Sequence, residues 1–252
     1  MKRLLLFVAV VQLSISSCTV YTPLQPTLPS IRNAGELEVR ASVQPTLRGD
    51  ASIAYSPAKH FLVSAAGGLR PQSNMPDSSL YRASLAEIGL GTYWPLGEYW
   101  TLHGLGGFGW GQADRNLSNG FIFASHANMF SRYQTQFLQV GTMLHYRRLK
   151  LGLGYRFTRV SFQELRSTNL DLPLENQLRH EPFLTARIEL GRQAVRHWQL
   201  ELSTALSVAQ RGQSTTADNY TPTESLMNMN RAGAGLLGFG IVYWLHPGAS
   251  NR

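Results

Sequence analysis

Apolar and polar residues alternate with a period of two over much of this chain, most clearly between Gln134 and Gln163. Over 138–146 and again over 149–157, one face holds mainly leucine, valine and aromatic residues. The other face holds glycines and charged residues, and almost no loop separates the two segments around Arg147 and Arg148. Successive side chains of a β-strand point to opposite faces, so this period is typical of strands. The pattern predicts a hairpin of two long antiparallel strands.

The alternation recurs along the chain and predicts about ten strands, with eight as the alternative. The expected strands cover 36–44, 48–56, 60–70, 81–94, 99–112, 134–146, 149–163, 180–191, 198–208 and 231–246. Short turns are expected near 57, 96, 148 and 194, and longer polar loops over 71–79, 114–132, 164–179 and 211–230. Short turns at one end and long loops at the other are typical of outer-membrane barrels. We therefore predict an all-β fold, an antiparallel up-and-down transmembrane β-barrel over 35–247, with both termini at the short-turn end and a tail at 248–252.

Composition agrees with a barrel rather than a helical membrane protein. Hydrophobic residues make up 43% of the chain and charged residues 15%, below the quarter or so that is usual in soluble proteins. No stretch of about 18 apolar residues occurs beyond the N-terminus, so no membrane-spanning helix is expected. A barrel exposes only every second residue to lipid, which accounts for a modest mean hydropathy.

The N-terminus has the pattern of an export signal over 1–17, with Lys2 and Arg3 before an apolar stretch. It ends in Ile-Ser-Ser followed by Cys18, which resembles the lipobox of bacterial lipoproteins. That resemblance implies cleavage before Cys18, its lipid modification with acyl chains such as palmitate, and sorting to the outer membrane because Thr19 is not acidic. The alternative is an ordinary signal peptide. Residues 18–34, with three prolines, are expected to be an extended tether between the lipid anchor and the first strand.

Aromatic residues gather near the short-turn end of the predicted strands. Tyr and Trp favour the membrane–water boundary, because part of each ring is apolar and part can hydrogen-bond. The residues expected to form this aromatic girdle are Tyr55, Tyr93, Trp94, Tyr99, Trp100, Tyr146, Trp198, Tyr243 and Trp244.

The opposite face of the strands carries charges of both signs, which would point into a narrow lumen. The charges expected there are Glu38, Arg40, Asp50, Glu87, Arg156, Arg187, Glu189 and Glu201. Unpaired charge in such a space is costly, so a paired network is expected. The prediction is a plugged or nearly plugged barrel.

Other chemical signals in the sequence are weak. Residues 104–109 and 233–238 match the dinucleotide pattern GxGxxG, but both lie within predicted strands rather than between a strand and a helix. The seven histidines form no spaced metal pair, so neither cofactor nor metal is expected. The formal net charge of +8 falls to +6 if 1–17 are removed, since 21 basic and 15 acidic residues then remain. These basic residues are dispersed, so nucleic-acid binding is not expected.

The lipobox, the strand alternation and the loop asymmetry together resemble small outer-membrane β-barrel lipoproteins of Gram-negative bacteria, a largely uncharacterised family. The resemblance implies a lipid-anchored protein with periplasmic termini, in contact with outer-membrane lipid. Three functions stay open. The first is a structural or interaction barrel with its long loops outward. The second is a lipid-modifying enzyme, for which Ser125 and His126 are the only adjacent nucleophile and base. The third is a tethered lipocalin-like barrel, in which Leu151, Leu153 and Phe157 would face inward.

Overall fold

The structure is a computed structural model that describes residues 21–71, 81–117, 127–167, 170–174, 176–191, 197–210 and 233–245. Within this described part every regular element is a β-strand. The strands are β1 (Leu37–Val43), β2 (Gly49–Ala58), β3 (Phe61–Arg70), β4 (Tyr81–Leu96), β5 (Trp100–Leu117), β6 (Ala127–Tyr146), β7 (Leu149–Ser167), β8 (Leu170–Asp171), β9 (Asn176–Glu189), β10 (Trp198–Ala209) and β11 (Ala234–Leu245).

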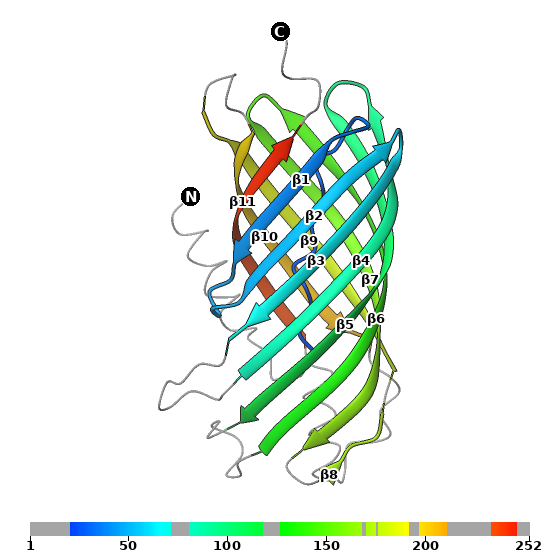
Figure 1. The fold of residues 1–252 in the computed structure, drawn as a ribbon, viewed down its shortest axis with the longest axis vertical. Helices are drawn as coiled ribbons and strands as arrows, with labels where there is room; N and C mark the ends of the chain where they lie inside the picture. The colour runs from blue at the N-terminus through cyan, green and yellow to red at the C-terminus, as the bar shows by residue number, and fades with distance from the viewer. Residues whose placement is uncertain are drawn as a thin grey trace.

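Ten of these strands close into one antiparallel barrel (Figure 1). Each strand pairs with its neighbour in sequence, except that β7 pairs directly with β9 and the two-residue β8 pairs only with the end of β7. The barrel closes where β1 pairs with β11, from Leu37 opposite Leu245 to Val43 opposite Phe239. The prediction of an antiparallel barrel of ten strands is confirmed, and the alternative of eight is wrong.

The strands differ greatly in length around the barrel. β1 has 7 residues, whereas β5, β6 and β7 have 18, 20 and 19. The polar loops predicted over 114–132 and 164–179 are therefore wrong at their ends, because β5 and β7 run into them, β6 begins within the first and β9 within the second. On β6 the outward side chains from 128 to 136 are mostly polar, while inward Met129 and Tyr133 are buried. The alternation continues there with its polarity reversed. Because the pattern expected of a lipid-facing strand was missing, most of these residues were predicted to be loop. The fourth predicted loop, 211–230, and nearly all of the first, 71–79, lie outside the described residues.

The outer face of the barrel is apolar over the height expected for a membrane. On β6 it is mainly apolar from Leu138 to Tyr146, close to the 9–11 or so residues that a tilted strand needs to span a bilayer. The predicted lipocalin-like alternative required Leu151, Leu153 and Phe157 to face inward. They lie outside with 43%, 57% and 41% of their surface exposed, so that alternative is wrong. No helix among the described residues is long and apolar enough to cross a membrane.

Residues 21–31, which we call the lumen segment, lie inside the barrel. Their trace passes behind β1 and β2 (Figure 1). Tyr21, Leu24, Leu28 and Ile31 are each at most 3% exposed. The prediction set residues 18–34 apart from the barrel domain as a tether, whereas the structure places residues 21–31 within the lumen. Prolines suit this place, because they favour an extended backbone and remove amide donors that the lumen would have to satisfy.

Candidate functional site

The lumen contains a buried ion-pair network near the short-turn end. Arg187 of β9 contacts Glu38 of β1 at 2.9 Å and Glu201 of β10 at 2.7 Å. Arg40 of β1 contacts the other oxygen of Glu201 at 2.5 Å. All four side chains are at most 4% exposed. β9 and β1 are not neighbours, since β10 and β11 lie between them. The network therefore bridges separated parts of the barrel wall.

A second network crosses the lumen further toward the long-loop end. Arg156 of β7 contacts Glu87 of β4 at 2.6 Å and Glu181 of β9 at 3.4 Å. Thr158 donates a hydrogen bond to the same oxygen of Glu181 at 2.7 Å. The Arg156 guanidinium also lies 3.9 Å from the centre of the Phe137 ring. Since β5 and β6 separate β4 from β7, this network too spans the lumen.

All eight charges predicted for the lumen lie on its inner face, and each takes part in an ion pair. The two not yet described are Glu189, which contacts Lys150 at 3.2 Å, and Asp50, which contacts Arg48 at 2.8 Å. Arg179 and Glu181 are also buried on the inner face of β9, although neither was among the predicted lumen charges. Arg179 was assigned to a loop, although it is fully buried on β9 and donates to Ser207 at 2.9 Å. The period of two on β9, extended by one residue, would have found Arg179.

The lumen segment contacts the wall chiefly through its backbone. The Pro23 carbonyl accepts a hydrogen bond from Arg48 at 2.7 Å, and the Thr27 carbonyl accepts one from Gln139 at 2.7 Å. The Ser30 amide donates to Glu38 at 2.7 Å, and Arg187 donates to the Ser30 hydroxyl at 2.8 Å. Residues 21–31 carry no charged side chain. The wall therefore supplies the charges, and the segment uses them as hydrogen-bond partners.

A tight turn connects the lumen segment to β1. Glu36 accepts hydrogen bonds from the Arg32 amide and the Asn33 side chain, both at 2.7 Å. Gly35 has a φ of 83°, a left-handed conformation that favours glycine. Its amide donates to the Ser56 carbonyl at 2.6 Å. The turn reverses the chain, so that the segment runs inside the barrel while β1 runs in its wall.

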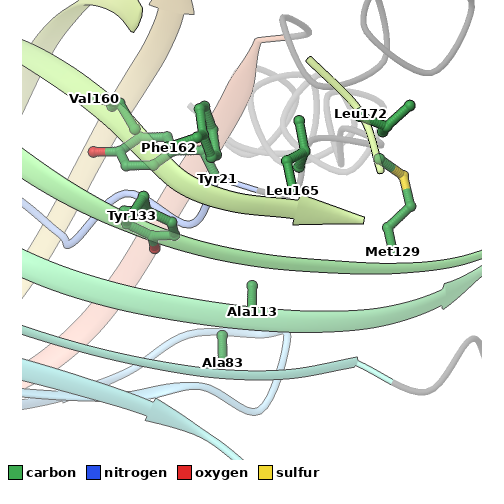
Figure 2. Packing of buried hydrophobic residues seen from close by; sticks show 9 residues of the cluster. All are labelled: Tyr21, Ala83, Ala113, Met129, Tyr133, Val160, Phe162, Leu165 and Leu172. Carbon is green, nitrogen blue, oxygen red and sulfur yellow. The ribbon is translucent and has the colours of Figure 1, made fainter. Parts of the chain in front are cut away.

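An apolar cluster fills the lumen at the long-loop end, and we call it the mouth cluster (Figure 2). The Tyr21 ring packs edge-on against Tyr133 with centroids 5.3 Å apart, and Tyr133 packs similarly against Phe162 at 5.9 Å. The Arg179 guanidinium lies 4.9 Å from the centre of the Tyr21 ring. The full set is Tyr21, Ala83, Ala113, Met129, Tyr133, Val160, Phe162, Leu165 and Leu172. These residues come from β4 to β7, the lumen segment and the chain after β8, so the cluster joins the segment to the longest strands.

A cavity of about 30 Å³ remains beside the lumen segment, lined in part by Gln25, Glu87 and Arg156. That volume is enough for about two water molecules, because each needs about 10–15 Å³. Both polar atoms of the buried Gln25 amide lack a protein hydrogen-bond partner, which suits such water. The lumen is therefore nearly filled by protein at this level.

The predicted aromatic girdle lies partly on the outer face. Tyr55, Trp94, Tyr99, Trp100, Tyr146 and Trp198 are 40–52% exposed, and Tyr243 packs against Trp198 with ring centroids 4.7 Å apart. Tyr93 is an exception, because it is fully buried and its hydroxyl lies 2.9 Å from that of Ser56. Trp244 is another, since it shares the inner face with buried Val242 and has Lys150 over its ring at 5.3 Å. Adjacent strand residues point oppositely, so Tyr93 and Trp94 cannot both face lipid.

Other predicted site residues fall outside the described part of the chain. Cys18, Ser125 and His126 all lie there. Within the described part no group of three or more His, Cys, Asp or Glu side chains is arranged to hold a metal ion.

A closed antiparallel barrel with an even number of strands, apolar side chains outside and charges inside is a β-barrel of the outer-membrane type. No family model matches the chain, and no curated protein matches it. Solved structures with a similar fold include the translocator domain of the autotransporter NalP from Neisseria meningitidis, with 12% identity and a TM-score of 0.43 over 82% of this chain and 86% of that one. The KdgM porin in complex with disordered oligogalacturonate shows 8% identity and a TM-score of 0.36 over 84% and 99%. A bacterial polysaccharide outer membrane secretin shows 9% and 0.26 over 86% and 100%. Since these TM-scores lie below 0.5, we base the fold on the strand pairing alone.

Proposed function

We propose that the protein is an outer-membrane β-barrel lipoprotein of a Gram-negative bacterium with a structural or interaction role and a lumen closed to general diffusion. The apolar outer band and the charged interior support a place in the membrane. The lipobox at Cys18 supports a lipid anchor. The long-loop end is proposed to face outward from the cell, as is general for such barrels.

The observation that carries the closed lumen is the pair of ion-pair networks that cross it. Arg156 and Glu87 bridge β7 to β4, and Arg187 and Glu38 bridge β9 to β1. The uncharged lumen segment fills the space that these networks leave, with its Pro23 and Thr27 carbonyls bonded to the wall. A solute would have to break buried ion pairs or displace the segment to pass.

Conductance of the full chain in planar bilayers tests this proposal. We expect the wild-type protein to conduct far less than a general porin, and the variant lacking residues 22–31 to conduct several-fold more. Double substitution of Arg156 and Glu87 by alanine in that deletion variant should raise conductance again, since it removes the remaining bridge. The double substitution Arg166→Ala with Glu164→Ala is the matched control, because this pair lies on the outer face. A wild-type conductance as large as that of general porins would refute the closed lumen.

An interaction role is favoured by the polar outer surface of the extended wall. Beyond the apolar band, Asp114, Arg132 and Arg166 line one shallow depression on the outside of β5, β6 and β7. Soluble partners recognise polar and charged surface of this kind, whereas the hydrocarbon of a membrane does not.

We propose no enzymatic role. A hydrolase would need Ser125 activated by a base and an oriented acid, and no acid can be assigned to it. Replacement of Ser125 by alanine should leave the lipid A and phospholipid profiles of the membrane unchanged. A changed profile would instead support an enzymatic role.

A further inference from the structure

The lumen segment has a definite direction through the barrel. At its C-terminal end Ile31 packs with Leu62 and Tyr93 close to the short turns. Arg32 donates hydrogen bonds to the carbonyls of Gly97 and Glu98, at the turn between β4 and β5. This end of the segment therefore lies at the short-turn end of the lumen.

Earlier residues of the segment contact positions that lie progressively nearer to the start of β6. A Cβ added to Gly141 would lie 2.7 Å from the Leu28 side chain. Gln139 bonds to the Thr27 carbonyl at 2.7 Å, and the Tyr133 hydroxyl bonds to the Thr22 carbonyl at 3.3 Å. β6 runs from the long-loop end at Ala127 to the short turn at Tyr146. The segment therefore crosses the barrel, and Tyr21 lies in the mouth cluster at the long-loop end.

The two ends of the described chain thus lie at opposite ends of the barrel. Leu245, the last residue of β11, pairs with Leu37 at the short-turn end. The prediction of both termini at that end holds for the barrel strands themselves, but the chain before β1 does not leave the barrel there. An even strand number places the start of the first strand and the end of the last strand at the same end of the barrel. It does not predict the course of the chain before the first strand.

We infer that the barrel carries its own N-terminal segment through the lumen, so that the chain ahead of Tyr21 is displayed on the long-loop side of the membrane. This inference rests on the membrane-spanning barrel proposed above. Cys18 precedes Tyr21 by three residues, which reach about 11 Å at most when fully extended. A lipid on Cys18 would therefore enter the leaflet on the long-loop side, not the leaflet beside the short turns.

Three single insertions of one epitope tag test the inference with Cys18 unchanged. The first lies between Val20 and Tyr21, the second in 72–80 between β3 and β4, and the third in the turn at 147–148. The second and third mark the long-loop and short-turn ends. Antibody binding is compared on intact and permeabilised cells, and the mobility shift on boiling verifies that each variant is folded. A site-specific protease sequence at position 20–21 provides a second readout of the same exposure.

We expect the tag at 20–21 to match the tag in 72–80 and to differ at least ten-fold in intact-cell signal from the tag at 147–148. Cleavage at 20–21 should follow the same sidedness. If the tag at 20–21 instead matches the tag at 147–148, the inference is overturned while the barrel stands. If the tags in 72–80 and 147–148 do not differ, the membrane-spanning barrel itself is overturned.

Discussion

The two ends of the lumen are closed by different kinds of contact. Near the short turns, Arg187, Glu38 and Glu201 form ion pairs between strands of the wall, each at 2.7–2.9 Å. At the long-loop end, Tyr21 and Tyr133 form an apolar contact between the lumen segment and the wall. The ion pairs hold one strand to another, whereas the aromatic contacts hold the segment to the strands. The stability of the barrel and the closure of its mouth should therefore respond to different substitutions.

The largest effect is expected from Arg187→Ala. This substitution leaves Glu38 without its ion-pair partner and Glu201 with Arg40 alone, all buried. Removing one partner of a buried pair costs about 3–5 kcal/mol. We expect the folded, fast-migrating form on a gel to be lost at a much lower temperature or urea concentration. Arg166→Ala is the control, because the Arg166 side chain is 62% exposed and its loss should change stability by less than about 0.5 kcal/mol. Equal behaviour of the two variants would contradict a stabilising role for the network near the short turns.

A different outcome is expected from Tyr21→Ala at the mouth. It removes the ring contacts with Tyr133 and Arg179. The packing of the segment in the lumen should become less stable by about 3 kcal/mol, as for other buried aromatic side chains replaced by alanine. The barrel strands keep all their pairs, so the boiling-dependent mobility shift should persist at wild-type temperatures. Protease sensitivity within residues 21–34 reports the loosening. Tyr21→Phe is the control and should stay close to wild type, since it keeps the aromatic ring and loses the 3.5 Å contact with Glu181. A fall in barrel stability as large as that of Arg187→Ala would remove the distinction between the two ends.

A smaller effect is expected from Gly141→Ala in the middle of the lumen. The added Cβ would lie 2.7 Å from Leu28 and 2.9 Å from the Leu153 carbonyl oxygen, and overpacking of this kind costs about 1–3 kcal/mol. Leu28→Ala in the same protein should recover part of that cost, with a coupling of about 1 kcal/mol. Urea unfolding of the two single variants and the double variant measures the coupling. Gly104→Ala is the control, because its Cβ would meet only Thr92 at an ordinary 3.7 Å. Strict additivity would mean that Leu28 does not pack against this part of the wall.

Sequence patterns predicted the wall of the barrel better than its contents. Alternation on single strands is enough to place Arg156 and Arg187 inward, because each strand residue points opposite to its neighbour. Alternation failed beyond the membrane, where inward Met129 and outward Arg132 reverse the usual polarity. The girdle prediction was wrong for a different reason: it placed both Tyr93 and Trp94 in the girdle by their position along the strand, although alternation puts them on opposite faces.

The lumen segment could not be predicted from local sequence. Its prolines and lack of charge indicate an extended chain, but the same composition is typical of a solvated tether. Its place is fixed by contacts with residues far away in sequence, such as Tyr133 and Gln139, 111 and 112 residues away. Only the closed barrel brings these partners together.

The turn at Gly35 has a consequence for the order of folding events. The lumen segment is joined through this turn to β1, and β1 is also the strand that completes the barrel by pairing with β11. The two pairing strands are the most distant in sequence, so their contact is the slowest kind to form. An assembly intermediate in which β1 has not yet docked would be both open along one side and empty. We therefore expect closure of the barrel and insertion of the lumen segment to be coupled during folding.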